Sequence, residues 1–514
     1  MLPPARAAAG WETGAVALTA ESPPATTRRR ALAPVLGLAA GVGAVHVVLS
    51  GRYGFHQDEL YLLSAGRHPA LGYVDQPPLA PLVARGVTAL MGEHLWALRL
   101  VSGAAHAGVV VAVAGIAAAL GGRARTIVLA ALAAATMPLL VAAGARFDPG
   151  SLGLLSWALA LWAVAAVLGG ADPRWWLGAG AALGATLMST WTGPLLALGL
   201  ILGLALAPGA RARLRSPWAA AGAVLALVVW SPNLVWQALN GWPALDVHAA
   251  AVAPAGRDGL ADFVTRQLVL AGPAGLVLAA AGVVWAWRHP PWRALAIPVV
   301  VTTVALAVAG ARAEDLGPAY LAAVPAGVLA VQAWAEGDSR RWHQAVGGVA
   351  ASGLVLVPLA APAAPLDVYA DLYLNLDASL AEEIGAPETA ALVSRVYDIL
   401  PADEKEDARV VTARAGEAAA LDLYGPARGL PRGYVLSPDR SYADWWPDLQ
   451  PRGTVVFVHY TRRELEPYCD ALGPIAILGN EFYMRNEAYE ATISVCSVMK
   501  VTPGQLRAGL IGDG

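Results

Sequence analysis

The sequence predicts an all-α polytopic membrane protein with about eleven transmembrane helices, give or take two, and a C-terminal extracytoplasmic α/β domain. Three observations predict this fold class. Of the 514 residues, 57% are hydrophobic and only 14% are charged, little more than half the charged share of a soluble globule. Apolar stretches long enough to cross a bilayer repeat as far as Ala361. Mixed charge and short β-rich runs follow, so the chain is an integral membrane protein with a second, polar part.

The N-terminus combines a polar tail with a first spanning helix. Residues 1–27 are rich in Ala, Pro and Thr and lack periodicity, so we expect a disordered cytoplasmic tail. Arg28, Arg29 and Arg30 then precede the apolar run 31–50. This run can cross a hydrocarbon core of about 30 Å and has no small-x-small cleavage site, so it is predicted to be a membrane span and not a signal peptide.

The transmembrane domain is predicted to cover residues 28–365. Its candidate spans are 31–50, 97–120, 125–143, 151–168, 175–189, 192–207, 217–237, 264–287, 293–310, 318–335 and 345–361. Arginines gather in alternate loops, at Arg123, Arg125, Arg174, Arg211, Arg213, Arg215, Arg288, Arg293, Arg340 and Arg341. The positive-inside rule then predicts a multi-pass plasma-membrane protein whose N-terminus is cytoplasmic.

Glycine pairs four residues apart lie within several candidate spans. They are Gly37 with Gly41, Gly180 with Gly184, and Gly199 with Gly203. Because glycine has no side chain, such pairs let helices approach closely in a membrane. We expect these pairs to pack helices together.

The loops of the opposite side hold the acidic residues. They include the long first outer loop, 51–96, a short loop carrying Arg146 and Asp148, and the loop 238–263. An odd number of spans also places the polar C-terminal part outside, where oxidising conditions permit a disulfide. Cys469 and Cys496 could pair there or remain two free thiols.

Residues 366–514 are predicted to form a soluble extracytoplasmic α/β domain. The runs 408–413 and 454–460 have the composition of strands, and helical runs follow each of them at 416–425 and 462–469. This alternation is typical of a small α/β domain. No nucleotide-binding fingerprint accompanies it.

The first outer loop carries the strongest chemical signal. Between residues 53 and 82 it places His56, Asp58 and Glu59 among aromatic and apolar residues. On a helix starting near His56, Glu59 shares a face with leucines while Asp58 points elsewhere. Asp58 could act as a general base that accepts a proton from a hydroxyl nucleophile, or it could cap an interfacial helix.

Four stretches carry a resemblance to a known family. They are HQDELYLLSAGRHPALGYVDQPPL (56–79), SPNLVWQALNGWPAL (231–245), FVTRQLVLAGPAGL (263–276) and GEAAALDLYGPARGLP (416–431). Together they resemble bacterial family 39 glycosyltransferases, which are relatives of protein O-mannosyltransferases and of the lipid A aminoarabinose transferase. The resemblance runs in the same order along nearly the whole chain after residue 45.

This resemblance implies a GT-C fold, with residues 28–365 as the catalytic domain and the active site at the outer membrane face. It implies transfer of a sugar, hexosyl or pentosyl, from a polyprenyl phosphate to an acceptor hydroxyl in the cell envelope, with inversion. The family's acidic pair matches Asp58 and Glu59, with Asp58 as the base, and a second loop acid matches Asp148. Asp148 precedes Pro149, so it could equally be a helix cap.

Transfer of a sugar from a lipid phosphate also needs cations around the departing phosphate. Arg146 is the leading candidate for the donor phosphate, and Arg67 and Arg312 are the other outer-face candidates, because guanidinium groups bind phosphate oxygens bidentately. Arg146 could instead be an interfacial arginine that reaches toward the headgroups. Gln76 stands where the resembled family commonly has a lysine, so we expect arginines to supply this charge.

The remaining predicted substrate-binding residues are His56, Tyr61, Asp75, Gln76, Trp236 and Gln237. For His56 a hydrogen-bonding role is favoured over metal ligation, because no ligand spacing accompanies it. No cofactor is required by the sequence. A divalent cation bridging Asp58 and Asp148 stays open as an alternative, since some GT-C enzymes hold such an ion with acids.

Three function classes remain in competition: a transferase, a transporter and a catalytically inactive scaffold. Intramembrane acids and arginines also mark transporters, so a transporter or flippase of a lipid-linked sugar is the alternative to a transferase. The sequence shows no inverted repeat, which favours the transferase. Expected partners are membrane lipid, a polyprenyl-phosphate sugar and an acceptor that is a cell-wall glycan, a lipid or a natural product. With a net charge of -3 and no clustered basic surface, nucleic acid is excluded as a partner.

Overall fold

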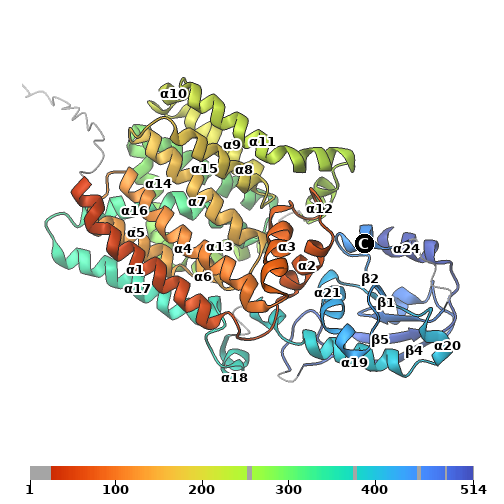
Figure 1. The fold of residues 1–514 in the computed structure, drawn as a ribbon. Coiled ribbons are helices and arrows are strands. Elements are labelled where there is room, and N and C mark those ends of the chain that lie inside the picture. Colours follow the sequence, from red (N-terminus) through yellow and green to blue (C-terminus); the bar gives the residue numbers. More distant parts are fainter. Residues whose placement is uncertain (1–24, 252–256, 374–378, 448–452, 481–482, 513–514) are drawn as a thin grey trace, which may run out of the picture.

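The computed structural model of the protein describes residues 25–251, 257–373, 379–447, 453–480 and 483–512. In Figure 1 a bundle of helices forms the larger body, and a smaller α/β domain, drawn in blue, lies against one end of it. Helices α2, α3 and α21 lie where the two bodies meet. The fold class predicted from the sequence is therefore confirmed.

The membrane body consists of long helices joined by short turns. Its helices are α1 (Ala25–Leu49), α2 (Gln57–Arg67), α3 (Leu79–Met91), α4 (Leu95–Ala119), α5 (Ala124–Thr136), α6 (Pro138–Ala145), α7 (Pro149–Leu168), α8 (Trp175–Leu187), α9 (Gly193–Leu206), α10 (Ala210–Arg213), α11 (Pro217–Leu239), α12 (Pro243–Ala251), α13 (Arg257–Leu270), α14 (Gly272–Arg288), α15 (Arg293–Ala309), α16 (Gly317–Trp334) and α17 (Ser339–Ala360), with 3-10 turns η1 (Pro290–Trp292) and η2 (Ala313–Leu316).

Every predicted span coincides with one helix or with a broken pair of helices. Within the described residues, seven helices are long and apolar enough to cross a membrane, and nine segments qualify if each bent pair is one span. Helices α8 and α9 have only 13 and 14 residues, about 20 Å of helix, which is short for a hydrocarbon core of about 30 Å. The predicted range is nine to thirteen, so a count of nine meets its lower limit and a count of seven falls below it.

The predicted N-terminal tail falls mostly outside the described residues. Residues 1–24 are not described, and helix α1 already begins at Ala25, inside the segment predicted as a tail. The helical boundary therefore lies three residues earlier than the arginine triplet indicated.

Two predicted spans are broken. Helix α5 meets α6 at 57°, where Pro138 occupies the first turn of α6. Helix α13 meets α14 at 106°, and Gly272 at this corner has a φ of 70°. The predicted span 264–287 is therefore a bent pair of helices, because the glycine with positive φ turns the chain sharply.

Glycines pack some of the helices closely. A Cβ at Gly180 would lie 2.0 Å from the carbonyl oxygen of Gly222, so α8 and α11 touch backbone to backbone, and Gly203 abuts α15 in the same way. The prediction is wrong for Gly37 and Gly41, which face open space on α1.

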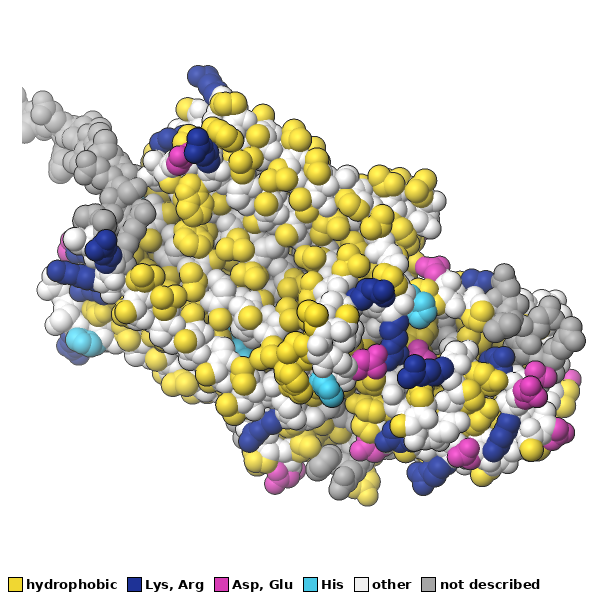
Figure 2. Space-filling view, in the orientation of Figure 1, with side chains coloured by type: hydrophobic (Ala, Val, Ile, Leu, Met, Phe, Trp, Pro, Cys, Tyr) yellow, Lys and Arg dark blue, Asp and Glu magenta, His cyan; other side chains and the backbone are white. Residues whose placement is uncertain are grey.

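The surface of the bundle is apolar. Figure 2 shows hydrophobic side chains covering this face of the bundle, while charged side chains gather at the α/β domain and at the opposite end. Large apolar side chains that are at least half exposed include Leu198, Ile201, Val224, Val228, Val277, Val304, Leu354 and Val355. A patch of this extent is not typical of a water-exposed surface, so these side chains face lipid.

Contacts between loops show which loops lie at the same end of the bundle. At one end Arg123 donates to Glu336 at 2.7 Å, and Arg125 lies 4.5 Å from the ring centre of Trp342. At the other end the first outer loop contacts the segment after α17, since Arg52 donates to Ala363 O at 2.8 Å. This sorting agrees with spans that cross in alternate directions.

The C-terminal domain contains a five-stranded sheet with helices on both faces. Its elements are α18 (Leu366–Val368), η3 (Tyr369–Tyr373), η4 (Ser379–Glu383), α19 (Ala386–Asp398), α20 (Ala402–Lys405), β1 (Arg409–Thr412), α21 (Ala415–Tyr424), η5 (Pro426–Arg428), β2 (Val435–Leu436), α22 (Tyr442–Trp445), β3 (Val455–Val458), α23 (Arg462–Leu465), β4 (Leu472–Ile477), β5 (Thr492–Cys496) and α24 (Pro503–Gly512).

The strand order is β2-β1-β3-β5-β4. Strand β1 runs parallel to β2 and β3, whereas β5 is antiparallel to β3 and β4. The two strands predicted from composition are β1 and β3, and the helix predicted after the first of them is α21. The second predicted helix, α23, is shorter than expected and ends at Leu465.

The hydrophobic core of the domain continues into the membrane body. Leu60 and Leu63 of α2, Leu98 of α4, Val410 of β1 and Leu421 of α21 belong to one buried cluster. The domain therefore docks on the first outer loop through apolar contacts, which places its loops beside α2.

A disulfide links two segments of the C-terminal domain. Cys469 and Cys496 form a disulfide with their Cα atoms 5.9 Å apart, and both are buried. The bond ties β5 to the segment before β4.

Candidate active site

Helix α2 presents the acidic pair through a cap at its N-terminus. The Nδ1 atom of His56 accepts a hydrogen bond from the backbone of Asp58 at 3.1 Å, and the His56 backbone donates to Glu59 Oε2 at 2.9 Å. The alternative in which Asp58 caps this helix is therefore wrong, because His56 and Glu59 form the cap. The Asp58 side chain remains available for other contacts.

Glu59 is fully buried and fully bonded. Its carboxylate accepts four hydrogen bonds: one from the His56 backbone, two from Arg99 at 3.0 and 2.9 Å, and one from the backbone of Phe147 at 2.9 Å. A carboxylate with both oxygens occupied in this way has no lone pair facing a substrate. Although the acidic pair was predicted as catalytic, the geometry gives Glu59 a positioning role.

Arg99 ties three segments of the chain together. It is 1% exposed and donates to the carbonyl oxygens of Arg52 and Gly54 at 3.1 and 2.9 Å. The same guanidinium lies 3.1 Å from Glu383 of the C-terminal domain. Burial raises the pKa of Glu383 to about 7, although Arg99 opposes this shift. We call Glu59, Arg99 and Glu383 the buried knot.

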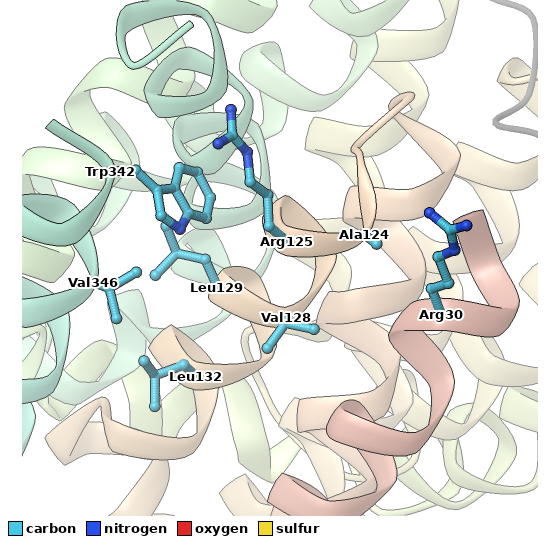
Figure 3. A pocket seen from close by; sticks show the side chains of 8 residues that line it. All are labelled: Arg30, Ala124, Arg125, Val128, Leu129, Leu132, Trp342 and Val346. Atoms are coloured by element: carbon cyan, nitrogen blue, oxygen red, sulfur yellow. The ribbon is translucent and has the colours of Figure 1, made fainter. Parts of the chain in front are cut away.

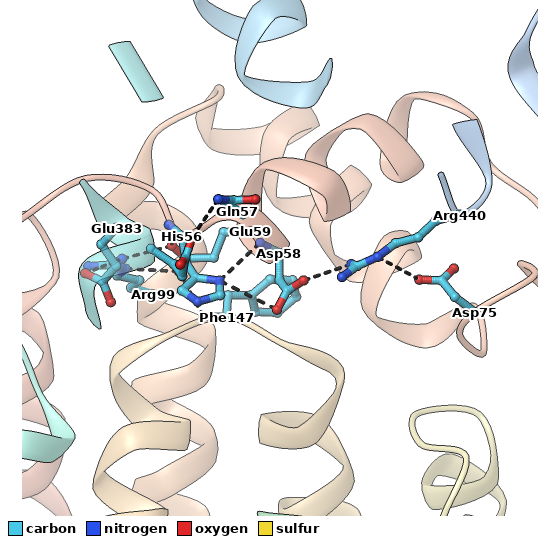
Figure 4. A network of polar contacts seen from close by, with 10 residues as sticks. His56, Gln57, Asp58, Glu59, Asp75, Arg99, Phe147, Glu383 and Arg440 are labelled. Atoms are coloured by element: carbon cyan, nitrogen blue, oxygen red, sulfur yellow. Dashed lines mark hydrogen bonds and ion pairs between the residues drawn. The ribbon is translucent and has the colours of Figure 1, made fainter. Parts of the chain in front are cut away.

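Asp58 is the accessible member of the acidic pair. Its side chain is 43% exposed, and its Oδ1 lies 2.8 Å from Nη1 of Arg440, which comes from the C-terminal domain (Figure 4). The surrounding protein raises the pKa of Asp58, but Arg440 and then His56 outweigh this and hold that pKa well below its usual range. Burial lowers the pKa of His56 to about 4, so the imidazole is neutral near pH 7.

Tyr61 and Asp75 lie on the other side of Arg440. The Tyr61 hydroxyl donates to Asp75 Oδ1 at 2.7 Å, and Arg440 Nε lies 3.9 Å from Asp75 Oδ2. Burial raises the pKa of Asp75 to about 6, while Arg440 and Tyr61 act against the shift. These two predicted substrate-binding residues therefore share one polar cluster with Asp58.

Arg146 and Asp148 approach this cluster from the turn between α6 and α7. Asp148 caps α7, because its Oδ1 accepts from Ser151 N at 2.7 Å. Burial lowers the pKa of Arg146, but nearby acids, Asp148 first and Asp58 among the others, raise it overall. Among the described residues, the Arg146 guanidinium has no hydrogen bond or ion pair, so its donors are available to an anion beside Asp58.

Arg67 and Arg312 are not part of this cluster. Arg67 pairs with Glu93 on the surface at 2.7 Å. Arg312 is 84% exposed and lies 3.9 Å from Asp315. None of these contacts reaches Asp58, so the structure gives neither arginine a place at the acidic pair.

Gln76, Trp236 and Gln237 hold the turn that carries Asp75. Tyr73 N donates to Gln76 O at 3.1 Å, and Gln237 Nε2 donates to Tyr73 O at 3.2 Å. The Trp236 ring occupies the space that a Cβ at Gly72 would need, 2.5 Å away. These three residues therefore position the first outer loop, and their predicted contact with substrate stays a prediction.

Sequence reasoning missed Arg99, Glu383 and Arg440. Arg99 carried a signal, because it is an ionisable residue inside an apolar run, and such residues are paired or functional. Glu383 and Arg440 carried none, since each lies more than 280 residues from its partner, Arg99 for Glu383 and Asp58 for Arg440.

A groove lies at the end of the bundle away from the C-terminal domain (Figure 3). Its volume is about 280 Å³, and it is lined by Arg30, Ala124, Arg125, Val128, Leu129, Leu132, Trp342 and Val346. No acidic side chain lines it, so it offers no carboxylate base. The acidic cluster around Asp58 is the better candidate for an active site.

The described residues do not form a metal cage. No group of three or more His, Cys, Asp or Glu side chains in the described part of the chain is placed to hold an ion. An ion between Asp58 and Asp148 would have just two carboxylates, one of which already caps a helix. We therefore derive no step through a metal.

Comparison with known proteins agrees with this arrangement. Residues 75–236 match the family described as dolichyl-phosphate-mannose-protein mannosyltransferase. The structure superposes on the crystal structure of ArnT from Cupriavidus metallidurans bound to undecaprenyl phosphate, with a TM-score of 0.57 and 16% identity, covering 90% of this chain and 97% of that one. The chain has a GT-C fold.

The apo structure of the same ArnT gives a TM-score of 0.56 over the same shares of both chains. No curated protein matches the chain in sequence. The coverage includes both the bundle and the C-terminal domain, so the GT-C likeness extends to the two bodies together. The resemblance inferred from the sequence motifs is thereby confirmed.

Proposed function

We propose that this protein is a membrane glycosyltransferase that moves a sugar from a polyprenyl-phosphate donor to an acceptor hydroxyl, with Asp58 as the base. The observation that carries the proposal is a half-exposed carboxylate, Asp58, at one end of an apolar bundle, with Arg146 on the neighbouring turn. The backbone of Phe147 in that turn donates to Glu59 at 2.9 Å, and within the described residues Arg146 has no ion pair. The match to protein mannosyltransferases and the likeness to ArnT, crystallised with undecaprenyl phosphate, support the choice of a lipid-linked donor.

The chemistry follows from this placement. The acceptor oxygen attacks the anomeric carbon while its proton passes to Asp58. The bond from that carbon to the phosphate oxygen breaks, and the polyprenyl phosphate leaves with the electron pair. A single displacement of this kind inverts the anomeric centre.

Arg146 stabilises the departing phosphate in this proposal. Negative charge grows on the phosphate as the bond breaks, and a guanidinium fixed at that position stabilises the transition state more than the ground state. The buried knot holds α2, and hence Asp58, in place without taking part in proton transfer.

The orientation follows from charge. Three arginines lie at the end of the bundle away from Asp58. Arg123 pairs with Glu336, Arg125 lies over the ring of Trp342, and Arg341 lies over the ring of Trp334. The positive-inside rule assigns that end to the cytoplasm, so the Asp58 end and the C-terminal domain face outward in the plasma membrane.

The test is donor consumption by the purified protein in detergent, with a panel of polyprenyl-phosphate hexoses and pentoses. We expect one donor to be consumed, and Asp58→Asn to reduce turnover by at least about 10³-fold with an unchanged unfolding midpoint. Asp470→Asn is the matched control, because Asp470 is a surface acid paired with Lys500 at 3.4 Å.

Two results would contradict the proposal. Turnover that survives Asp58→Asn would remove Asp58 as the base. Movement of labelled lipid-linked sugar across proteoliposomes, without consumption of any donor, would identify a transporter instead.

A further inference from the structure

Arg440 reaches from the C-terminal domain into the polar cluster of the membrane body. It lies between β2 and α22 with a φ of 51°, a left-handed conformation that non-glycine residues adopt at a cost of about 1 kcal/mol or more. The next residue fixes this turn on the first outer loop, because Ser441 N donates to the Tyr61 hydroxyl at 3.3 Å and Ser441 Oγ accepts from Val74 N at 3.2 Å. The strained backbone is thus held with its side chain aimed at Asp58.

The Arg440 guanidinium is only partly used. Within the described part of the chain it makes one hydrogen bond, to Asp58 at 2.8 Å. It also has a looser ion pair with Asp75 at 3.9 Å and lies 5.1 Å from the Tyr61 ring centre. A guanidinium has five N–H donors. The side chain is 39% exposed, so most of these donors can still meet a ligand.

We propose that Arg440 is a second ligand of the donor phosphate, and that it releases Asp58 when it moves onto that phosphate. This inference rests on the proposed function. It assigns the C-terminal domain a residue in the active site and makes the base available only when a donor is present.

The balance of charges supports this exchange of Arg440 between Asp58 and the phosphate. In the structure, Arg440 balances the charge of the Asp58 carboxylate. During transfer Asp58 takes up a proton and becomes neutral, while the phosphate changes from a singly charged diester to a monoester with nearly two charges. The negative charge therefore moves from Asp58 to the phosphate, and a cation that stood between them is attracted to the second site. Arg146 and Arg440 together match the charge of the leaving group.

The present contact also explains why release is needed. An arginine bonded to Asp58 Oδ1 occupies an acceptor position and stabilises the ionised form, which makes the carboxylate a poor proton acceptor. A purely structural contact between the domains would need no such coupling, and the domain already docks through the apolar cluster around α2 and α21.

The test measures equilibrium binding of undecaprenyl phosphate to the full-length protein in detergent. We expect Arg440→Gln to weaken binding about tenfold or more, and Arg440→Lys to weaken it less, because lysine keeps the charge without the fork. Arg409→Gln is the matched control, since Arg409 stacks on Tyr434 at the start of β1, the opposite end of the strands. Unfolding midpoints of all variants exclude misfolding.

The decisive variant removes the Asp58 carboxylate, which competes with the donor phosphate for Arg440. In Asp58→Asn, Arg440 no longer has a carboxylate partner there, so undecaprenyl phosphate should bind several-fold more tightly than to the wild type. In the double variant Asp58→Asn, Arg440→Gln this gain should disappear. A gain that persists without Arg440 would reflect general loss of negative charge and would overturn the exchange.

The outcomes separate the two proposals. A wild-type protein that does not bind undecaprenyl phosphate would contradict the proposed function itself. A wild-type protein that binds it, with Arg440→Gln binding equally well, would leave the transferase intact and overturn the role of Arg440.

Discussion

Two acid–arginine pairs, formed by adjacent residues of one helix, have opposite surroundings. The pair of Glu59 and Arg99 is about 1% exposed on both sides, and every oxygen of the acid is bonded. The pair of Asp58 and Arg440 is about 40% exposed on both sides and has one hydrogen bond. The Glu59–Arg99 pair is therefore a fixed structural contact, whereas the Asp58–Arg440 pair can exchange partners with a substrate.

The difference is one of energetics as well as of access. Breaking a buried pair leaves an uncompensated charge and costs about 3–5 kcal/mol, whereas an exposed pair contributes about 0–1 kcal/mol. Burial and donor count thus distinguish a positioning acid from a reactive one, although the two are adjacent in sequence.

The largest expected effect comes from breaking the buried knot. Arg99→Met should lower the free energy of unfolding by about 3–5 kcal/mol, because Glu59 and Glu383 would remain buried without their cation. Thermal unfolding in detergent, followed by tryptophan fluorescence, measures it.

Arg67→Met is the matched control for that experiment. Arg67 pairs with Glu93 on the surface, and its loss should change the free energy of unfolding by less than about 1 kcal/mol. Equal losses in the two variants would refute the contrast between the buried and the exposed pair.

The next effect concerns the domain that carries Arg440. Replacing Cys469 and Cys496 by serine opens a loop with a sequence separation of 27 and should destabilise the domain by about 3.5 kcal/mol. The measurement is unfolding of the full chain with and without a reductant. If the wild type unfolds at the same temperature under both conditions, the disulfide does not contribute as stated.

Arg146→Gln should have a smaller effect, on chemistry alone. We expect kcat/KM for the donor to fall about 10²-fold, or about 2.7 kcal/mol, with an unchanged unfolding midpoint. Steady-state kinetics on the donor identified by the panel measure this effect. A lower unfolding midpoint with normal turnover per folded molecule would instead place Arg146 with the structural residues.

The smallest effect is a pH dependence within the buried knot. Because the pKa of Glu383 is raised to about 7 from an ordinary value near 4.5, the folded state binds the proton more tightly than the unfolded state. This acid therefore lowers stability progressively as pH rises from about 4.5 to 7. The difference in unfolding midpoint between Glu383→Gln and the wild type should therefore be more favourable to the variant at pH 8 than at pH 5.

The control for Glu383→Gln is an exposed acid. Glu93→Gln should show the same difference from wild type at both pH values, because Glu93 is on the surface. If Glu383→Gln behaves like this control, the carboxyl group of Glu383 does not bind its proton more tightly in the folded state.

Local patterns predicted much of the fold. The start of α2 near His56, strands β1 and β3, and the helical nature of all eleven predicted spans follow from periodicity and composition over short windows. The bend at Gly272 and the open faces of Gly37 and Gly41 could not be predicted, because they depend on which helices become neighbours.

The candidate site was predicted only as far as its local residues. Asp58, Tyr61 and Asp75 lie in one loop and were found together, and Arg146 follows from the next outer loop. Arg440 lies 382 residues from Asp58, so only the docked C-terminal domain reveals that contact. The same docking brings Glu383 to Arg99.

The central claim is that Asp58 accepts the proton of the acceptor hydroxyl, whereas Glu59 holds α2 in place. The most direct measurement compares turnover per folded molecule and the unfolding midpoint for Asp58→Asn and Glu59→Gln, purified side by side. We predict that Asp58→Asn loses turnover with a wild-type midpoint, whereas Glu59→Gln lowers the midpoint and keeps substantial turnover in the folded fraction. A reversed result, with Glu59→Gln stable and inactive and Asp58→Asn active, would contradict the account.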